Sequence, residues 1–348
     1  MPGDLQTPTG GYAYARHLIG ELPACGWDVA PVRLPDSYPF PGANAIAETE
    51  RLLLDVPRAA PLLIDGLALG AMPPELVAAL PQPVAALVHH PLGLESGLSN
   101  RDRAHLLDNE RRVLAHADTV IATSQTTADT LTTQFAVAAA RVHVAEPGVA
   151  AAERARGSDG TGVALLAVGA VSERKGYDVL IEALARLPRD VSNAPGWTLT
   201  LVGDSSRAPE TAERLRALIA EHDLTDRITM TGAISAQAVD AAYASADAFV
   251  LSSRYEGYGM VLTEALARGL PIVSTTGGAA AQTLPDAAGI KIPPDDALAL
   301  SDALARMIGD ADLRARYANA AWAAAADLPR WSDTAASVAA ALNEVVDV

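Results

Sequence analysis

The sequence predicts an α/β protein of two doubly wound domains with parallel sheets, and three observations support this fold class. Short apolar runs typical of strands alternate with helical segments along the chain, which is the pattern of βαβ units. The length of 348 residues suits about two domains with substantial cores. A polar, glycine-rich stretch at residues 151–162 is the best candidate for a linker between them. We therefore expect one domain at residues 1–150 and the other at 151–331.

The first half of the chain contains expected strands separated by helical segments. The strands are Leu62–Ile64, Val84–Val88, Val120–Ala122 and Val142–Val144, and the helices include Tyr12–Leu22, Pro74–Leu80, Arg103–Ala115 and Thr126–Phe135. Short continuous apolar runs are typical of strands that a parallel sheet buries on both faces.

The second half repeats this architecture without visible sequence similarity to the first. Its expected strands are Ala164–Val168, Thr198–Val202, Ile228–Thr231, Ala248–Leu251 and Pro271–Ser274. Two helices follow near the C-terminus, one over Asp310–Ala326 and a last one that Ser332 can cap and that runs to about Val345.

Composition and charge exclude several classes of protein. Half of the residues are apolar and 20% are charged, as in a folded globular chain. A net charge of −16 argues against nucleic acid as a partner. No apolar run reaches the roughly 20 residues that span a bilayer, and the N-terminus resembles no signal peptide, so we expect no integral membrane segment. The single cysteine, Cys25, excludes an internal disulfide and fits a cytoplasmic location.

The most informative segment is SSRYEGYGMVLTEALARGLPIVSTTGG, residues 252–278. It places Glu256 and Glu264 eight positions apart, with Gly257 and Gly259 in a turn between an expected strand and a short helix. Backbone amides at a helix start suit a phosphate or a sugar oxygen, and ionised carboxylates accept hydrogen bonds from hydroxyl groups. The segment therefore indicates a nucleotide-sugar site.

This segment resembles the E-x7-E signature of a large family of retaining glycosyltransferases with the GT-B fold, family 4. Further segments resemble family motifs in the right order: VIATS (120–124), VAEPGV (144–149), LLAVGAVSERKGYDVLIEAL (165–184), LTLVGD (199–204) and ITMTGAISAQAVDAAYASADAFVLSS (228–253). The resemblance implies two Rossmann-like domains facing each other across a cleft, with the C-terminal helix, residues 332–348, packed back on the first domain. It also implies a retaining hexosyltransferase that uses a nucleotide-diphosphate sugar such as a UDP- or GDP-sugar.

The resemblance assigns catalytic roles to four residues. Arg174 and Lys175 would bind the diphosphate and offset its developing charge without a metal; taken alone, they would be two solvated loop residues. Glu256 would hold the transferred sugar. His89-His90 follows an expected strand at the point where relatives carry a histidine that touches the donor sugar, and we slightly favour His90 over His89 for this role. The other would be a buried structural histidine.

Donor-binding roles fall by the same resemblance on eight residues. Glu264 would accept hydrogen bonds from the donor ribose, and Ile234 would contact the base through its backbone. The others would supply backbone amides or a close approach to the sugar and phosphates: Gly10, Gly11, Gly257, Tyr258, Gly259 and Met260. Without the resemblance, Glu264 would be an exposed helix residue, and Gly10-Gly11 would be an ordinary turn.

The chain departs from the family pattern in two places. The hydrophobic strand that normally precedes the glycine loop is missing, so we expect the first domain to lack its first strand, as in a truncated gene or a degenerate protein. Gly277-Gly278 resembles the start of the family's GG-x-P-E loop, but Ala279 and two further alanines follow, so that acidic contact with the donor is not available.

Neither a metal nor another cofactor is expected. The pattern Asp310-Ala311-Asp312 and the pair Asp295-Asp296 are typical of helix starts and turns. Two other functions remain open: a catalytically inactive protein that binds nucleotide sugars, and a glycoside hydrolase that uses Glu256 and Glu264 as its two carboxylates. The acceptor, whether glycan, lipid or small molecule, is not specified by the sequence.

Overall fold

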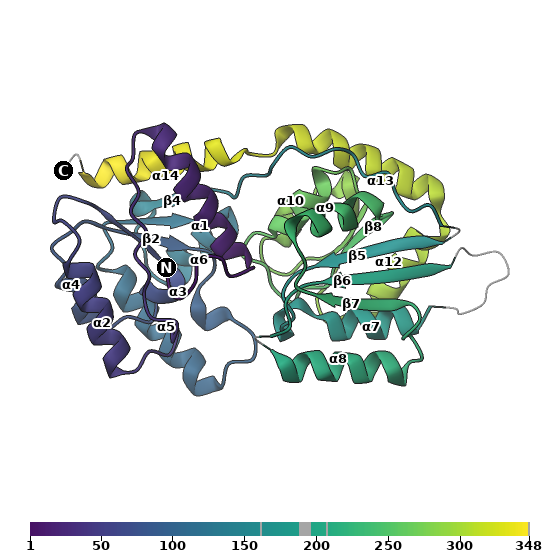
Figure 1. Cartoon of the computed structure of the whole chain (residues 1–348), viewed down its shortest axis with the longest axis horizontal. Helices are drawn as coiled ribbons and strands as arrows, with labels where there is room; N and C mark the ends of the chain where they lie inside the picture. Colours follow the sequence, from purple (N-terminus) through teal and green to yellow (C-terminus); the bar gives the residue numbers. More distant parts are fainter. Residues whose placement is uncertain (161, 188–195, 207, 347–348) are drawn as a thin grey trace. The chain divides into compact units, whose positions relative to one another are not determined.

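The computed structural model describes residues 1–160, 162–187, 196–206 and 208–346. The chain forms two compact units (Figure 1): unit 1 comprises Met1–Gly148 and Pro329–Val348, and unit 2 comprises Val149–Leu328. Each unit contains one parallel sheet. Residue 161 of the expected linker and residues 347–348 of the expected C-terminal helix lie outside the described residues.

The sheet of unit 1 has four parallel strands in the order β1-β2-β3-β4. The strands are β1 (Leu62–Asp65), β2 (Val84–Val88), β3 (Thr119–Ala122) and β4 (Val142–Val144). Every residue of β2 and β3 is buried, as expected of strands covered on both faces. In the described part of unit 1 no strand precedes β1, and an isolated bridge joins Pro2 to Leu34. The expected lack of a first strand is therefore observed.

The helices of unit 1 connect its strands or flank its sheet. They are α1 (Gly10–Glu21), α2 (Ala43–Leu54), α3 (Gly66–Leu69), α4 (Pro74–Ala78), α5 (Asn100–Leu114), α6 (Gln125–Gln134) and α14 (Trp331–Val346), with short 3₁₀ turns at Leu22–Cys25, Leu92–Leu94 and Ala139–Arg141.

The sheet of unit 2 has six parallel strands in the order β10-β9-β8-β5-β6-β7. The strands are β5 (Val163–Val168), β6 (Trp197–Val202), β7 (Ile228–Gly232), β8 (Ala248–Leu251), β9 (Ile272–Thr275) and β10 (Gly289–Ile292). The helices are α7 (Tyr177–Ala185), α8 (Pro209–Glu221), α9 (Ala236–Ser245), α10 (Met260–Leu266), α11 (Ala280–Thr283), α12 (Ala297–Gly309) and α13 (Ala311–Ala324), with 3₁₀ turns at Glu173–Lys175, Asp286–Ala288 and Ala325–Asp327.

Side chains that alternate along the strands of unit 2 fill two separate cores. Leu165 and Val250 belong to the core formed with α7, α8 and α12, whereas Leu166 and Phe249 belong to the core formed with α9, α10 and α13. Figure 1 shows α7 and α8 on one side of this sheet and α9 and α10 on the other. Because successive side chains of a strand point to opposite faces, the apolar runs of the sequence supply both layers. The loops at the carboxyl ends of the strands are then left to form a site.

Acidic side chains accept hydrogen bonds from backbone amides at the starts of three C-terminal helices. Asp296 accepts a hydrogen bond from the Ala299 amide, and Asp310 accepts one from the Leu313 amide, both at 2.8 Å, as expected for helix starts. The predicted cap of the last helix is wrong, because α14 already begins at Trp331 and Ser332 lies inside it. Instead, the Asp333 carboxylate accepts a hydrogen bond from the Arg330 amide at 2.8 Å. An ionised acceptor makes the stronger cap.

Candidate active site

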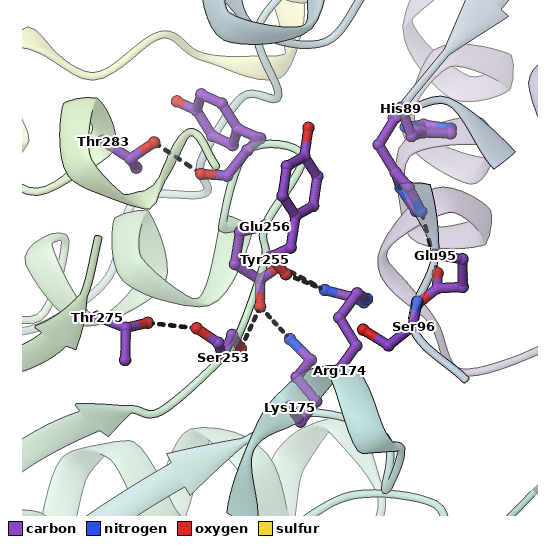
Figure 2. A network of polar contacts seen from close by, with 12 residues as sticks. His89, Glu95, Ser96, Arg174, Lys175, Ser253, Tyr255, Glu256, Thr275 and Thr283 are labelled. Carbon is purple, nitrogen blue, oxygen red and sulfur yellow. Dashed lines mark hydrogen bonds and ion pairs between the residues drawn. The ribbon is translucent and has the colours of Figure 1, made fainter. Parts of the chain in front are cut away.

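Two cations and a carboxylate lie together where the strands of unit 2 end. Lys175 Nζ lies 2.6 Å from Glu256 Oε1, and Arg174 Nη1 lies 3.1 Å from Glu256 Oε2 (Figure 2). Ser253 Oγ donates to the same Oε1 at 2.6 Å. Lys175 and Glu256 are only 8% and 6% exposed. Their charges are therefore largely removed from water, and each needs the other as a partner.

The backbone brings this cluster together because β5 and β8 are neighbours in the sheet. The loop after β8 is tied to the loop after β5 by two hydrogen bonds: the Arg254 amide donates to the Arg174 carbonyl at 2.7 Å, and Ser252 Oγ donates to the Lys175 carbonyl at 2.8 Å. Gly176 has a φ of 60°, and a Cβ there would clash with the Ser252 carbonyl oxygen. Glycine is the residue that permits this turn.

Glu256 stays ionised at neutral pH. Burial raises its pKa, but the charges of Lys175 and Arg174 and the hydrogen bonds from Lys175 and Ser253 outweigh this effect and lower the pKa to about 2. The cluster therefore sets two positive charges against one negative charge. The excess positive charge suits an anionic group of a ligand.

The glycine turn of residues 257–260 leads from Glu256 into α10. Gly259, directly before the helix, has a φ of 95°, which favours glycine. The amides of Gly259 and Met260 donate to no atom of the described residues, so they can bind a ligand oxygen. Tyr258 is 8% exposed, and its carbonyl accepts a hydrogen bond from Thr283 Oγ1 at 2.6 Å.

Gly277 and Gly278 hold the same turn from its other side. The Glu256 amide donates to the Gly277 carbonyl at 3.2 Å, and the Ala279 amide donates to the Glu256 carbonyl at 2.8 Å. A Cβ on Gly278 would clash with the Glu256 carbonyl oxygen. These glycines therefore permit the close approach of two backbones even though no Pro-x-Glu sequence follows them.

Glu264 lies on α10 beside α9. Its Oε2 accepts a hydrogen bond from the Tyr243 hydroxyl at 2.8 Å. Burial raises the pKa of Glu264, while the hydrogen bond from Tyr243 and the charge of Arg268 oppose that rise. Its Oε1 has no partner among the described residues and can accept a hydrogen bond from a ligand hydroxyl. Ile234, between β7 and α9, packs partly buried against the core of α9 and α10.

A cavity of about 150 Å³ lies at the ends of β5, β6 and β7. Gly169, Gly203 and Gly232 line it, and a Cβ on Gly203 would clash with the Gly169 carbonyl oxygen. Glycines at three neighbouring strand ends thus keep the space open. Ser205 and Arg216 also line the cavity and were not among the predicted site residues. Ser205 directly follows the LTLVGD segment, whereas Arg216 lies on α8 and follows no recognisable motif.

In unit 1, the two histidines have different surroundings. Gly10 and Gly11 begin α1, and a Cβ on Gly11 would lie 3.3 Å from His89 Nε2. His89 therefore lies against the glycine loop. Its Nε2 also lies 3.3 Å from Asp65 Oδ2. His90 Nε2 instead lies 3.0 Å from Glu95 Oε2. The role predicted for His90 stays a prediction.

Sequence reasoning missed two residues that the structure places beside predicted ones. Ser253 binds Glu256, and Asp65 faces His89. Both follow an apolar run that ends at the carboxyl edge of a sheet. The same position led to His89-His90, so it could have led to these residues.

The described residues contain neither a candidate metal site nor a helix suited to cross a membrane. Residues 1–160, 162–187, 196–206 and 208–346 contain no group of three or more His, Cys, Asp or Glu side chains that could hold a metal ion. Across these same residues, no helix combines the length and the apolar character that crossing a membrane requires.

The chain belongs to the glycosyl transferases group 1. The model of that family matches residues 150–323, and the model of Glycosyltransferase Family 4 matches residues 9–153. The family predicted from the E-x7-E segment and its companion motifs is thereby confirmed.

Curated relatives are glycosyltransferases and a sugar-phosphate synthase. A D-inositol 3-phosphate glycosyltransferase from Xylanimonas cellulosilytica is 29% identical over 66% of this chain and 57% of the relative. A mannosylfructose-phosphate synthase from Agrobacterium fabrum is 30% identical over 49% of this chain and 40% of the relative. The alignments span about half the length of the curated relatives.

Solved structures resemble the whole chain. Sucrose-phosphate synthase from Thermosynechococcus elongatus has a TM-score of 0.79 at 22% identity, over 98% of this chain and 96% of the other. Alr3699/HepE from Anabaena, in complex with UDP and glucose, has a TM-score of 0.77 at 19% identity, over 99% and 98%. Together with the two parallel sheets, these likenesses confirm the GT-B fold.

Proposed function

We propose that this chain is a retaining, metal-independent hexosyltransferase that moves a sugar from a nucleotide-diphosphate sugar to an acceptor hydroxyl. The observation that supports this function most is the buried cluster of Arg174, Lys175 and Glu256, whose excess positive charge suits a diphosphate. Membership of the glycosyl transferases group 1 supports the same reaction class.

In the proposed reaction, Lys175 and Arg174 bind the diphosphate. The bond between the sugar C1 and the phosphate oxygen breaks, and the acceptor oxygen bonds to C1 from the same face. The leaving phosphate takes the proton of the acceptor hydroxyl. The two cations offset the negative charge that develops on the leaving oxygen, so the step requires neither a protein nucleophile nor a metal.

The other predicted residues would bind the remaining parts of the donor. Glu264 Oε1 would accept a hydrogen bond from the ribose, and Ile234 would meet the base through its backbone. Backbone groups of the two glycine loops would approach the sugar and the phosphates, and one histidine of His89-His90 would contact the sugar. The loops are residues 10–11 and 257–260.

Glu256 argues against the hydrolase alternative. A glycoside hydrolase pairs an acid of raised pKa, which Glu264 could supply, with a carboxylate that must be free to attack the sugar. Both oxygens of Glu256 are instead paired with Lys175 and Arg174. The inactive-binder alternative is motivated by Ala279, where relatives continue toward Pro and Glu. It predicts nucleotide binding without turnover.

The two lysines of the chain, Lys175 and Lys291, allow a matched test. Lys291 pairs with Asp286 at 2.6 Å outside the cluster. We expect Lys175→Ala to slow the release of UDP or GDP from nucleotide sugars about 100-fold or more, and Lys291→Ala to keep the wild-type rate. Circular dichroism would check that both variants fold, and EDTA would check metal independence.

Three other results would count against the proposal. Wild-type rates in Lys175→Ala would remove this residue from the mechanism. Binding of UDP or GDP without turnover, with every donor and acceptor offered, would favour the inactive binder. The third result concerns the sugar that slow hydrolysis of the donor releases. Proton NMR, recorded before mutarotation, should show that this sugar has the same anomeric configuration as the donor. The opposite anomer would rule out retention.

A further inference from the structure

A buried carboxylate of unit 1, Asp65, has no role so far, and it faces His89, one of the two histidines proposed for the sugar contact. Asp65 ends β1, and His89 directly follows β2, the neighbouring parallel strand. Both residues therefore lie at the carboxyl edge of the sheet, where doubly wound folds bind their ligands. Asp65 is 4% exposed, and its Oδ2 lies 3.3 Å from His89 Nε2. Among the residues that the structure describes, neither of these buried atoms has a hydrogen-bond partner, so each faces the other without a formed hydrogen bond.

Asp65 is fixed in place and ionised. Its Oδ1 accepts a hydrogen bond from the Leu67 amide at 2.9 Å, where α3 begins. Burial raises the pKa of Asp65, but His89 (as a nearby hydrogen-bond donor and, when it is protonated, through its charge), the Leu67 amide and the positive N-terminal amine of Met1 lower it below its ordinary value. Because an ionised carboxylate can only accept, the facing Nε2 must carry a proton for the two to bind. A separation of 3.3 Å is long for such a bond, as is common before a substrate is bound.

His89 is held through both its ring and its backbone. The Tyr14 ring meets it edge-on with centroids 5.2 Å apart, and the Tyr14 hydroxyl is itself fixed by the Ala145 carbonyl at 2.9 Å. The hydroxyls of Thr123 and Thr127 both donate to the His89 carbonyl at 3.3 Å. The threonines therefore fix the backbone of His89, and the Tyr14 ring packs against its imidazole.

Nδ1 is the ring atom that remains for a ligand. It makes no hydrogen bond within the described residues, and unlike Nε2 it is not fully buried. In a neutral imidazole whose proton sits on Nε2, Nδ1 is a hydrogen-bond acceptor. Hydroxyl groups of sugars are suitable donors to it.

We infer that Asp65 is a positioning residue that fixes the Nε2-protonated tautomer of His89, so that Nδ1 accepts a hydrogen bond from a sugar hydroxyl. The inference rests on the proposed function for the identity of the ligand, and it selects His89 over His90 for the sugar contact. His90 faces Glu95, whose side chain is 38% exposed, and a partner so open to water fixes a tautomer less firmly.

The tautomer can be measured without any substrate. Protein with ¹⁵N-labelled histidine, studied at a pH where His89 is neutral, should show a protonated Nε2 and a bare Nδ1; the His89→Gln variant assigns the signals. Asp65→Asn should destroy this preference, because an amide can donate to Nε2 as well as accept from it. Glu95→Gln makes the same chemical change beside His90 and should leave the His89 tautomer unaltered. A proton on Nδ1 in the wild type, or an unchanged tautomer in Asp65→Asn, would overturn the inference.

Kinetics tests the consequence for the sugar. Asp65→Asn should lower kcat for UDP or GDP release about 10-fold, while calorimetry with UDP and GDP alone should show unchanged affinity, since neither has a transferable sugar. Unchanged kcat alongside an altered tautomer would refute a positioning role. If the wild type turned over no nucleotide sugar, the proposed function would fail, yet the NMR result would still decide whether Asp65 sets the tautomer. If Asp65→Asn failed to fold, the wild-type tautomer would decide alone.

Discussion

Glu256 already forms ion pairs with the two cations that the proposed reaction needs for binding the diphosphate. Its Oε1 forms an ion pair with Lys175 Nζ at 2.6 Å, and its Oε2 forms one with Arg174 Nη1 at 3.1 Å. The carboxylate thus orders both cations before a ligand arrives. It also competes with an anionic ligand for them.

This competition predicts the effect of Glu256→Gln on product binding. The amide keeps the shape of the side chain and removes its charge, so UDP and GDP should bind about 10-fold more tightly. Turnover should fall, because the sugar loses its charged acceptor. Calorimetry with the two nucleotides measures the first effect, and Glu173→Gln is the control, since Glu173 pairs with the exposed Arg214 at 2.8 Å. Weaker binding of UDP and GDP by Glu256→Gln would contradict the argument.

At the scale of elements, the β-strands were predicted well where apolar residues run without interruption. Val84–Val88 and Ala248–Leu251 have the predicted bounds, because strands buried on both faces leave no polar position inside them. The strand Gly289–Ile292 was not predicted. It is short, contains Lys291 and lies at the edge of the sheet, where water tolerates polar residues.

The site was harder to predict than the strands. Spacing alone pointed to Glu256 and its glycine turn, but the contact between Lys175 and Glu256 joins residues 81 positions apart. Only the order of the strands brings their loops together. Asp65 directly follows an expected strand, as His89 does, but only the pairing of β1 with β2 shows that the two side chains face each other.

Helix α5 contains a buried acid that should make unit 1 sensitive to pH. Glu110 is 1% exposed, and its Oε2 accepts a hydrogen bond from the Leu92 amide at 2.9 Å. Burial raises its pKa to about 8 from a usual 4.5, against the lowering effect of the Leu92 amide. Between these values the unfolded chain has lost the proton and the folded chain has kept it. Stability therefore falls as pH rises through this window.

Glu110→Gln should remove this dependence. Glutamine stays neutral and keeps an oxygen for the Leu92 amide, so the variant should be more stable than the wild type at pH 8, by up to about 4 kcal/mol, and nearly equal to it at pH 4.5. Urea unfolding at both pH values measures the difference. Glu75→Gln is the control, because the Glu75 side chain is 76% exposed. Parallel pH profiles for wild type and Glu110→Gln would show that burial does not shift this carboxyl group.

On the scale of the whole molecule, unit 1 is built from both ends of the chain. Trp331, at the start of α14, stacks on His17 with ring centroids 4.1 Å apart and meets Tyr14 edge-on at 5.6 Å. Thr334 Oγ1 donates to the Glu146 carbonyl at 2.7 Å. The C-terminal helix therefore completes a core whose other parts precede residue 149.

This organisation predicts that Trp331→Ala weakens unit 1 selectively. Trp331 is 8% exposed, and removing a buried tryptophan should cost about 3–5 kcal/mol. Trp322→Ala is the matched control, because Trp322 lies on α13 of unit 2 and is 41% exposed; its loss should cost about 0.5 kcal/mol or less. Hydrogen exchange read by mass spectrometry should then show faster exchange in peptides covering β1 to β4 and unchanged exchange in those covering β5 to β10. Equal acceleration in both sets of peptides would mean that α14 stabilises the chain as a whole and is not a part of unit 1 alone.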